Sequence, residues 1–344
     1  MNIFMVGPDS ASKGGISTVI SNFKKHFRVE GKEISYFDSW SESHPIRSSI
    51  SAIFSVRKKV KESKADVIHM HVAQKGSFLR KSILALTLSK KYPIIFHMHA
   101  SQFDTFYEQA NPILKKYIRW VLCRVEQLVV LSTQWRDFYE SVTGRTDIQV
   151  VENAVQLPEN YHYNPDAVNI VTFGRIGKRK GSYDILKLAK AIGKIHPKIQ
   201  FVLYGDGELD TVQQKIEKLE LKNVQLGGWL TKEEQSSIFK STLLHLLPSY
   251  QEGLPMAILE SMSFGIPNMA STVGGIPEVV IDQENGMLIE AGRVNEMEEK
   301  LLEFLNDKGV RNTYSQAARN KIEQEFAIDP YFYKWVLLYD NLEK

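Results

Sequence analysis

Short apolar runs alternate with amphipathic segments along the whole chain. Apolar runs of strand length in the first half lie at residues 2–6, 66–72, 93–99 and 127–132. The segments between them have the hydrophobic spacing of helices. The same alternation restarts in the second half, with runs at residues 169–174, 199–205, 224–229 and 243–249. This pattern predicts α/β architecture, with parallel sheets covered by helices on both faces.

A polar segment with two prolines interrupts the alternation at residues 153–168. Such a segment is typical of a linker. The chain has 344 residues, a length that suits two domains, each large enough for its own core. We therefore predict two doubly wound, Rossmann-like domains, the first ending near residue 163 and the second starting near 164. Two facing sheets of this kind would form a ligand cleft.

Composition and charge narrow the choice of function. No apolar segment is long enough to span a bilayer, and the N-terminus lacks the pattern of a secretory signal. The single cysteine, Cys123, fits a reducing cytoplasm. Residues 1–163 hold 22 basic and 15 acidic side chains, whereas residues 164–344 hold 21 and 25, so the halves carry +7 and −4. A basic first half favours contact with an anionic membrane surface or a phosphorylated acceptor.

Three glycine-containing loops are candidates for phosphate binding. In "FGRIGKRKGS" a strand is followed by a basic loop, in which Arg175 and Lys180 could hold a diphosphate, and then by a helix. Lys178 and Arg179 of the same loop are interpreted as solvated. The remaining loops contribute Gly205 and Gly207 of "YGDGE", and Gly14 and Gly15 before a helical run. None of them matches the dinucleotide fingerprint, which disfavours an oxidoreductase.

The stretch "YQEGLPMAILESMSFGIP" contains two glutamates, Glu252 and Glu260, around the start of a short helix at residues 255–264. Helical side chains tilt toward the N-terminus, so the Glu260 carboxylate can point back toward Glu252. Between them, a helix start offers backbone amides to an anion. These amides belong to Gly253, Leu254 and Met256. We interpret the unit as two carboxylates for sugar hydroxyls flanking a phosphate site.

These motifs resemble the retaining glycosyltransferases of family 4, which have the GT-B fold. The resemblance covers most of the chain and is most specific at residues 252–280, where Glu252 and Glu260 end an E-x7-E pattern. The other matching motifs are "GGIS", "HMHAS", "VENAV", "FGRIGKRKG", "YGDGE" and "LGGW".

The resemblance implies a role for each candidate residue. Glu252 would contact the transferred sugar, and Glu260 would bind the ribose hydroxyls. Arg175 and Lys180 would bind the donor diphosphate. His99 would meet the sugar near the reacting carbon, whereas His97 is expected in the core.

Family resemblance also implies retention of configuration, without a protein nucleophile. The chain has no D-x-D triplet, so we expect basic side chains and helix amides to stabilise the departing diphosphate without a metal. We expect a hexose donor of the UDP-sugar type and no further cofactor.

The acceptor is suggested by the basic half. Residues 57–64, 75–91 and 112–124 mix basic and apolar side chains as interfacial helices do, although each also fits an ordinary helix with a solvated basic face. We predict peripheral contact with the inner face of the cell membrane, a lipid-linked oligosaccharide acceptor, and a role in bacterial capsule or other surface-polysaccharide assembly.

The chain's final helix carries an apolar stripe of Phe332, Trp335, Val336 and Tyr339 after Pro330. In the resembling enzymes this helix packs on the first domain. We therefore predict a first domain of residues 1–163 plus 331–344, a second of 164–330, and a hinge whose closure would bring His99 toward Glu252 and Arg175.

Other functions remain open. A nucleotide-sugar epimerase could share this architecture, and a catalytically silent nucleotide-sugar sensor would keep the diphosphate loop. Nucleic-acid binding is disfavoured, because the basic excess is small and aromatic stacking motifs are missing.

Overall fold

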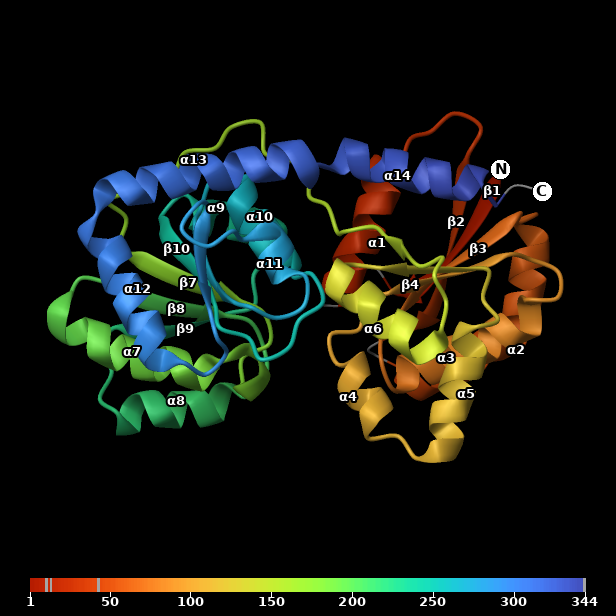
Figure 1. The fold of residues 1–344 in the computed structure, drawn as a ribbon, viewed down its shortest axis with the longest axis horizontal. Coiled ribbons are helices and arrows are strands. Elements are labelled where there is room, and N and C mark those ends of the chain that lie inside the picture. The colour runs from red at the N-terminus through yellow and green to blue at the C-terminus, as the bar shows by residue number, and fades with distance from the viewer. Residues whose placement is uncertain (10–11, 13, 42–43, 343–344) are drawn as a thin grey trace. The chain divides into compact units, whose positions relative to one another are not determined.

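The computed structural model describes residues 1–9, 12, 14–41 and 44–342. The chain divides into two compact units (Figure 1). Unit 1 comprises Met1–Ala154 with Ile328–Lys344, and unit 2 comprises Val155–Ala327. The first boundary lies nine residues before the predicted one, and the second lies three residues before it. Ser10, Ala11 and Lys13 of the first glycine loop, and the last two residues of the predicted terminal segment, lie outside the described residues.

Unit 1 contains a six-stranded, all-parallel sheet in the order β2-β1-β3-β4-β5-β6. Its strands are β1 (Asn2–Pro8), β2 (Glu33–Trp40), β3 (Val67–Val72), β4 (Ile94–Met98), β5 (Gln127–Val130) and β6 (Gln149–Val150). The apolar runs predicted β1, β3, β4 and β5, which supply most of the buried sheet. The two edge strands were missed, because β2 alternates exposed and partly buried residues and β6 has only two residues.

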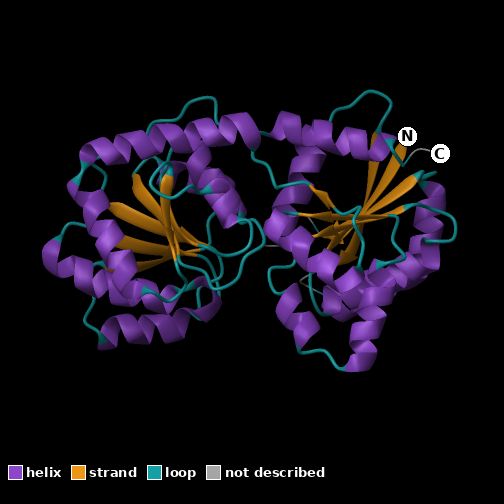
Figure 2. Ribbon diagram, in the orientation of Figure 1, coloured by secondary structure: helices purple, strands orange, loops and turns teal. Residues whose placement is uncertain are grey.

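Helices surround this sheet (Figure 2). They are α1 (Gly15–His26), α2 (Pro45–Glu62), α3 (Gly76–Leu88), α4 (Phe103–Glu108), α5 (Pro112–Leu122), α6 (Thr133–Thr143) and α14 (Ile328–Asp340). The apolar faces of α2, α3, α4, α5 and α6 form one core with one face of the sheet.

Unit 2 repeats the design with a second all-parallel sheet, in the order β12-β11-β10-β7-β8-β9. Its strands are β7 (Asn169–Phe173), β8 (Gln200–Tyr204), β9 (Val224–Gly228), β10 (Thr242–Leu247), β11 (Asn268–Ser271) and β12 (Gly286–Ile289). Its helices are α7 (Ser182–Ile195), α8 (Leu209–Lys218), α9 (Lys232–Phe239), α10 (Met256–Ser263), α11 (Ile276–Val279), α12 (Val294–Asn306) and α13 (Lys308–Glu325). Two doubly wound, Rossmann-like sheets confirm the predicted fold class.

The last helix, α14, packs on unit 1 as predicted. Trp335 is fully buried, and its ring stacks on His69 of β3 with centroids 4.3 Å apart. Phe332 packs edge-on against Phe23 of α1. The helical run breaks between Glu325 and Ile328, just before Pro330, and α14 accommodates the proline in its first turn, where a missing N–H costs little.

Because all strands of each sheet run parallel, their carboxyl ends lie along one edge, and ligands of such sheets bind there. His99 follows β4 at this edge in unit 1, and Gly14 follows β1. In unit 2, the loop that holds Arg175 follows β7, the "YGDGE" loop follows β8, and Glu252 follows β10.

Candidate active site

The basic loop after β7 is tightly curled. Gly174, Gly177 and Gly181 have φ values of +130°, +150° and +71°, which glycine adopts without strain. The curl brings the Lys180 side chain back over the start of the loop, with Nζ 3.4 Å from the position of a Cβ at Gly174. Arg175 of the same loop is exposed. The predicted diphosphate-binding pair therefore lies on one short loop.

The "YGDGE" loop packs directly against this basic loop. The Ile176 amide donates to the Asp206 carbonyl at 2.6 Å. A Cβ at Gly205 would lie 1.8 Å from the Gly174 carbonyl oxygen, and one at Gly207 would lie 2.3 Å from that of Ile176. Both glycines are thus required by contact between the two loops. Their predicted approach to a ligand stays a prediction.

Glu252 forms a buried ion pair with Lys180. The Lys180 Nζ lies 2.5 Å from Glu252 Oε1, and the two side chains are 13% and 7% exposed. Arg179 Nη1 lies 3.8 Å from the same oxygen and donates to the Gln251 carbonyl at 3.0 Å. The structure therefore joins two predicted site residues that lie far apart in the sequence. It also corrects one expectation: Arg179 is not simply solvated, because its side chain is 33% exposed and contacts Gln251 and Glu252, whereas Lys178 is exposed as expected.

The start of α10 lies directly after this carboxylate. Pro255 is the N-cap, no side chain caps the helix, and no acidic residue occurs in the first turn. The Gly275 amide donates to the Gly253 carbonyl at 2.6 Å, which holds the segment before the helix in place. Leu254 and Met256 are buried. The helix start suits an anion, because its dipole is positive and its first amides lack helical partners.

Glu260 lies within α10 and is partly exposed. Its Oε2 accepts a hydrogen bond from the Gln235 side chain of α9 at 3.0 Å. Burial raises the pKa of its carboxyl, while Lys232 and the Gln235 bond act in the opposite direction. A carboxylate held by one donor keeps acceptor capacity for hydroxyl groups.

In unit 1, His99 lies just past β4 and is partly exposed. Its backbone amide donates to the Val72 carbonyl at 2.7 Å, and its Nε2 lies 2.9 Å from Nδ1 of the buried His71. Burial, with a contribution from the Lys81 cation, lowers the pKa of His99 to about 3. His99 is therefore a neutral imidazole at physiological pH, fixed in orientation by His71.

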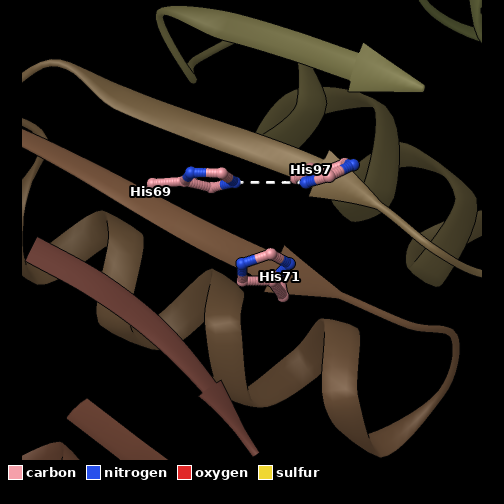
Figure 3. A group of neighbouring side chains, drawn as sticks. All are labelled: His69, His71 and His97. Atoms are coloured by element: carbon pink, nitrogen blue, oxygen red, sulfur yellow. Dashed lines mark hydrogen bonds between the residues drawn. The ribbon is translucent and has the colours of Figure 1, made fainter. Parts of the chain in front are cut away.

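Three histidine rings, those of His69, His71 and His97, lie together in the core of unit 1 (Figure 3). His69 Nε2 lies 3.2 Å from His97 Nδ1, and His69 Nδ1 lies 2.7 Å from the Tyr339 hydroxyl. His97 is fully buried, as expected. Burial lowers the pKa of His69, His71 and His97 well below the usual value. Ligand atoms of these three lie within 4.8 Å of one another, a spacing that a metal ion could use. The expectation of a metal-free enzyme stays a prediction.

Gly14 and Gly15 start α1. Gly14 has a φ of +122°, and both residues are exposed. No side chain caps this helix, so its start is open to an anion, and the predicted phosphate contact stays a prediction.

Sequence reasoning missed Arg179, His71 and two basic residues of α3, Arg80 and Lys81. One signal for His71 was available: "HMH" occurs in β3 and again at the end of β4. Parallel pairing sets His71 opposite His97.

Comparisons with known proteins agree with this geometry. Residues 13–158 match the family model for Glycosyltransferase Family 4, and residues 157–321 match the family model for Glycosyl transferases group 1. An uncharacterized 41.2 kDa protein in the cps region of Klebsiella pneumoniae is 28% identical over 93% of this chain and 95% of its own length. The UDP-Gal:alpha-D-GlcNAc-diphosphoundecaprenol alpha-1,3-galactosyltransferase of Escherichia coli is 26% identical, covering 81% of this chain and 76% of its own.

A solved structure shows the same fold. Anabaena HepE in complex with UDP-glucose superposes with a TM-score of 0.81 at 17% identity, over 99% of this chain and 100% of that one. Together, the two matched regions cover residues 13–321 and contain the loops described above. The chain therefore belongs to the glycosyltransferases, with a family 4 domain followed by a group 1 domain in a GT-B fold.

Proposed function

We propose that this protein transfers a hexose from a UDP-sugar to a lipid-linked glycan acceptor, with retention of configuration, in surface-polysaccharide assembly. The observation that carries the proposal is the Lys180–Glu252 ion pair beside the uncapped start of α10. It places a cation, a carboxylate and a helix N-terminus within one part of unit 2. A nucleotide sugar needs these three groups for its diphosphate and its hydroxyls.

In this proposal the ion pair changes partners when the donor binds. The diphosphate would take over the Lys180 ammonium, together with the exposed Arg175 and the α10 amides. Glu252 would then accept hydroxyl groups of the transferred sugar. Glu260, already held by Gln235, would accept the ribose hydroxyls.

The chemistry then needs little from the protein beyond charge stabilisation. The bond between the anomeric carbon and the phosphate oxygen breaks, and the acceptor oxygen bonds to the same face of that carbon. The acceptor's proton passes to the departing phosphate oxygen. Arg175, Lys180 and the helix amides offset the charge that develops on the diphosphate. His99, with its low pKa, serves as a neutral hydrogen-bonding group near the sugar and not as an acid.

A surface of unit 1 supports peripheral contact with an anionic membrane. Ile46, Ile50 and Phe54 of α2 are 75%, 51% and 82% exposed, and they recur at helical spacing. Leu79 and Ile83 of α3 are also exposed. Arg47, Arg57, Lys58, Lys59 and Lys61 add positive charge to α2. Apolar anchors among basic side chains are typical of interfacial helices. No helix in the described part of the chain is both long and apolar enough to cross a bilayer.

Three similar proteins support different parts of this proposal. The E. coli relative is named for a UDP-galactose donor and a diphosphoundecaprenol-linked acceptor. HepE was solved with UDP-glucose. The Klebsiella relative is encoded in a cps region.

The test is a transfer assay with a panel of UDP-sugars and a prenyl-diphosphate-linked monosaccharide as acceptor. Mass spectrometry would detect the added hexose, and NMR of the product would give its anomeric configuration. A changed UDP-sugar without any transfer would indicate the epimerase instead. UDP-sugar binding without hydrolysis or transfer would indicate a silent sensor.

A further inference from the structure

Helix α3 carries a buried lysine that the mechanism above does not use. Lys81 is 1% exposed, although lysine is among the residues least often buried. Helical side chains tilt toward the helix N-terminus, which for α3 lies near the carboxyl end of β3. The Lys81 charge contributes to the lowered pKa values of His71 and His99 at this edge of the sheet. The tilt and these interactions indicate that its ammonium group faces the carboxyl end of β3, the side on which His99 lies.

The neighbouring Arg80 also reaches back to the start of α3. Its Nη1 lies 3.8 Å from the position of a Cβ at Gly76, the first residue of the helix. Its Nε is buried and has no hydrogen-bond partner among the residues that the structure describes. A guanidinium with a buried, unsatisfied donor over a helix start is oriented for an acceptor that is not part of the chain.

No carboxylate lies close to these two cations in the sequence. Residues 67–103 contain no aspartate or glutamate. Burial lowers the pKa of Lys81 to about 7, and Arg80 contributes in the same direction. Within the described residues, no ion pair involving Lys81 is found. Two cations and the positive end of a helix dipole thus converge without an anionic partner.

We propose that Arg80, Lys81 and the first turn of α3 bind a phosphate group of the acceptor substrate. Its assignment to the acceptor rests on the proposed function, since a prenyl-linked acceptor carries its diphosphate next to the sugar. The anion site itself rests only on the geometry of α3. This surface would place the acceptor's phosphate on the His99 side of unit 1.

The test is isothermal titration of the full-length protein with inorganic pyrophosphate, with excess UDP present to occupy the proposed donor site. We expect Lys81→Met and Arg80→Gln each to weaken pyrophosphate binding at least about tenfold, as loss of one charge-assisted bond does. Lys90→Gln, at an exposed position beyond the other end of α3, is the matched control and should bind as the wild type does. A second titration uses farnesyl diphosphate in detergent. Comparing its affinity with that of pyrophosphate shows whether the site prefers a lipid-linked diphosphate or a free one.

Stronger binding of farnesyl diphosphate than of pyrophosphate, lost in both variants, would support the acceptor assignment. Wild-type affinity in Lys81→Met, or no pyrophosphate binding by the wild type, would overturn the proposal. A melting temperature of Lys81→Met at or above that of the wild type would exclude misfolding as the cause of lost binding. If UDP does not bind but pyrophosphate binding still depends on Lys81, the donor proposal fails while the anion site stands.

Discussion

Replacing Glu252 with glutamine tests the ion pair at the centre of the site. The change keeps the side chain's size but leaves Lys180 without its carboxylate, and Arg179 loses the same neighbour. Removing one partner of a buried pair typically costs about 3–5 kcal/mol. Because Lys180 is still 13% exposed and can turn toward water, we expect a loss of about 3 kcal/mol in the free energy of unfolding, at the lower end of that range. Glu252→Gln should also abolish transfer.

Urea unfolding followed by circular dichroism measures this cost, and an exposed pair supplies the control. Glu290 pairs with Arg293 at 3.1 Å, but the side chains are 68% and 70% exposed, so Glu290→Gln should change stability by less than about 0.5 kcal/mol. Adding Lys180→Met to Glu252→Gln removes the unpaired charge and should restore at least about 1 kcal/mol. The reasoning is refuted if Glu252→Gln is as stable as Glu290→Gln, or if the second substitution restores nothing.

Four further predictions follow from other parts of the molecule. Burial lowers the pKa of Lys81 in the folded chain to about 7, against 10.5 for an ordinary lysine, so between these pH values the unfolded chain holds a proton that the folded chain lacks. The free energy of unfolding of the wild type relative to Lys81→Met should therefore rise with pH across this window, by up to roughly 5 kcal/mol. If urea unfolding gave both proteins the same dependence of this free energy on pH, the burial of this charge would be contradicted. Truncation before Tyr331 removes Trp335 from its stack on His69 and should destabilise unit 1 and abolish transfer, which thermal unfolding and the transfer assay would show; wild-type stability of the truncated chain would count against it. Phe54→Glu should reduce flotation with anionic vesicles while leaving transfer to a soluble acceptor analogue unchanged, and undiminished flotation would remove α2 from the membrane surface. Transfer should survive excess EDTA, and a strict requirement for added Mg²⁺ or Mn²⁺ would argue against charge stabilisation by side chains alone.

The sequence predicted most of the fold, because central strands of parallel sheets are continuous apolar runs. In unit 2 it missed β12 and also β11, whose residues Asn268 and Ser271 are polar but fully buried. Such a strand has no hydrophobic pattern to detect. The short helix start at Met256 was predicted within a residue, since Pro255 is a strong local signal.

Site contacts were less accessible to sequence reasoning. The motifs named Lys180 and Glu252 separately, but nothing local says that residues 72 apart form an ion pair. The role of Arg179 depends on the curl of its loop, and the burial of Lys81 depends on which face of α3 meets the sheet. These are tertiary properties. The predicted cost of breaking the ion pair and the proposed phosphate site both depend on them.

The most direct test of the donor site compares the affinities of UDP and uridine for the wild type and Arg175→Gln by isothermal titration. The account predicts that the wild type strongly prefers UDP, because the diphosphate contributes charge-assisted bonds. Arg175→Gln should lower this preference at least about tenfold. Lys178→Gln, an exposed change on the same loop, should leave it unaltered. An equal preference for UDP in the wild type and Arg175→Gln, or no UDP binding by the wild type, would contradict the assignment of unit 2 as the donor site.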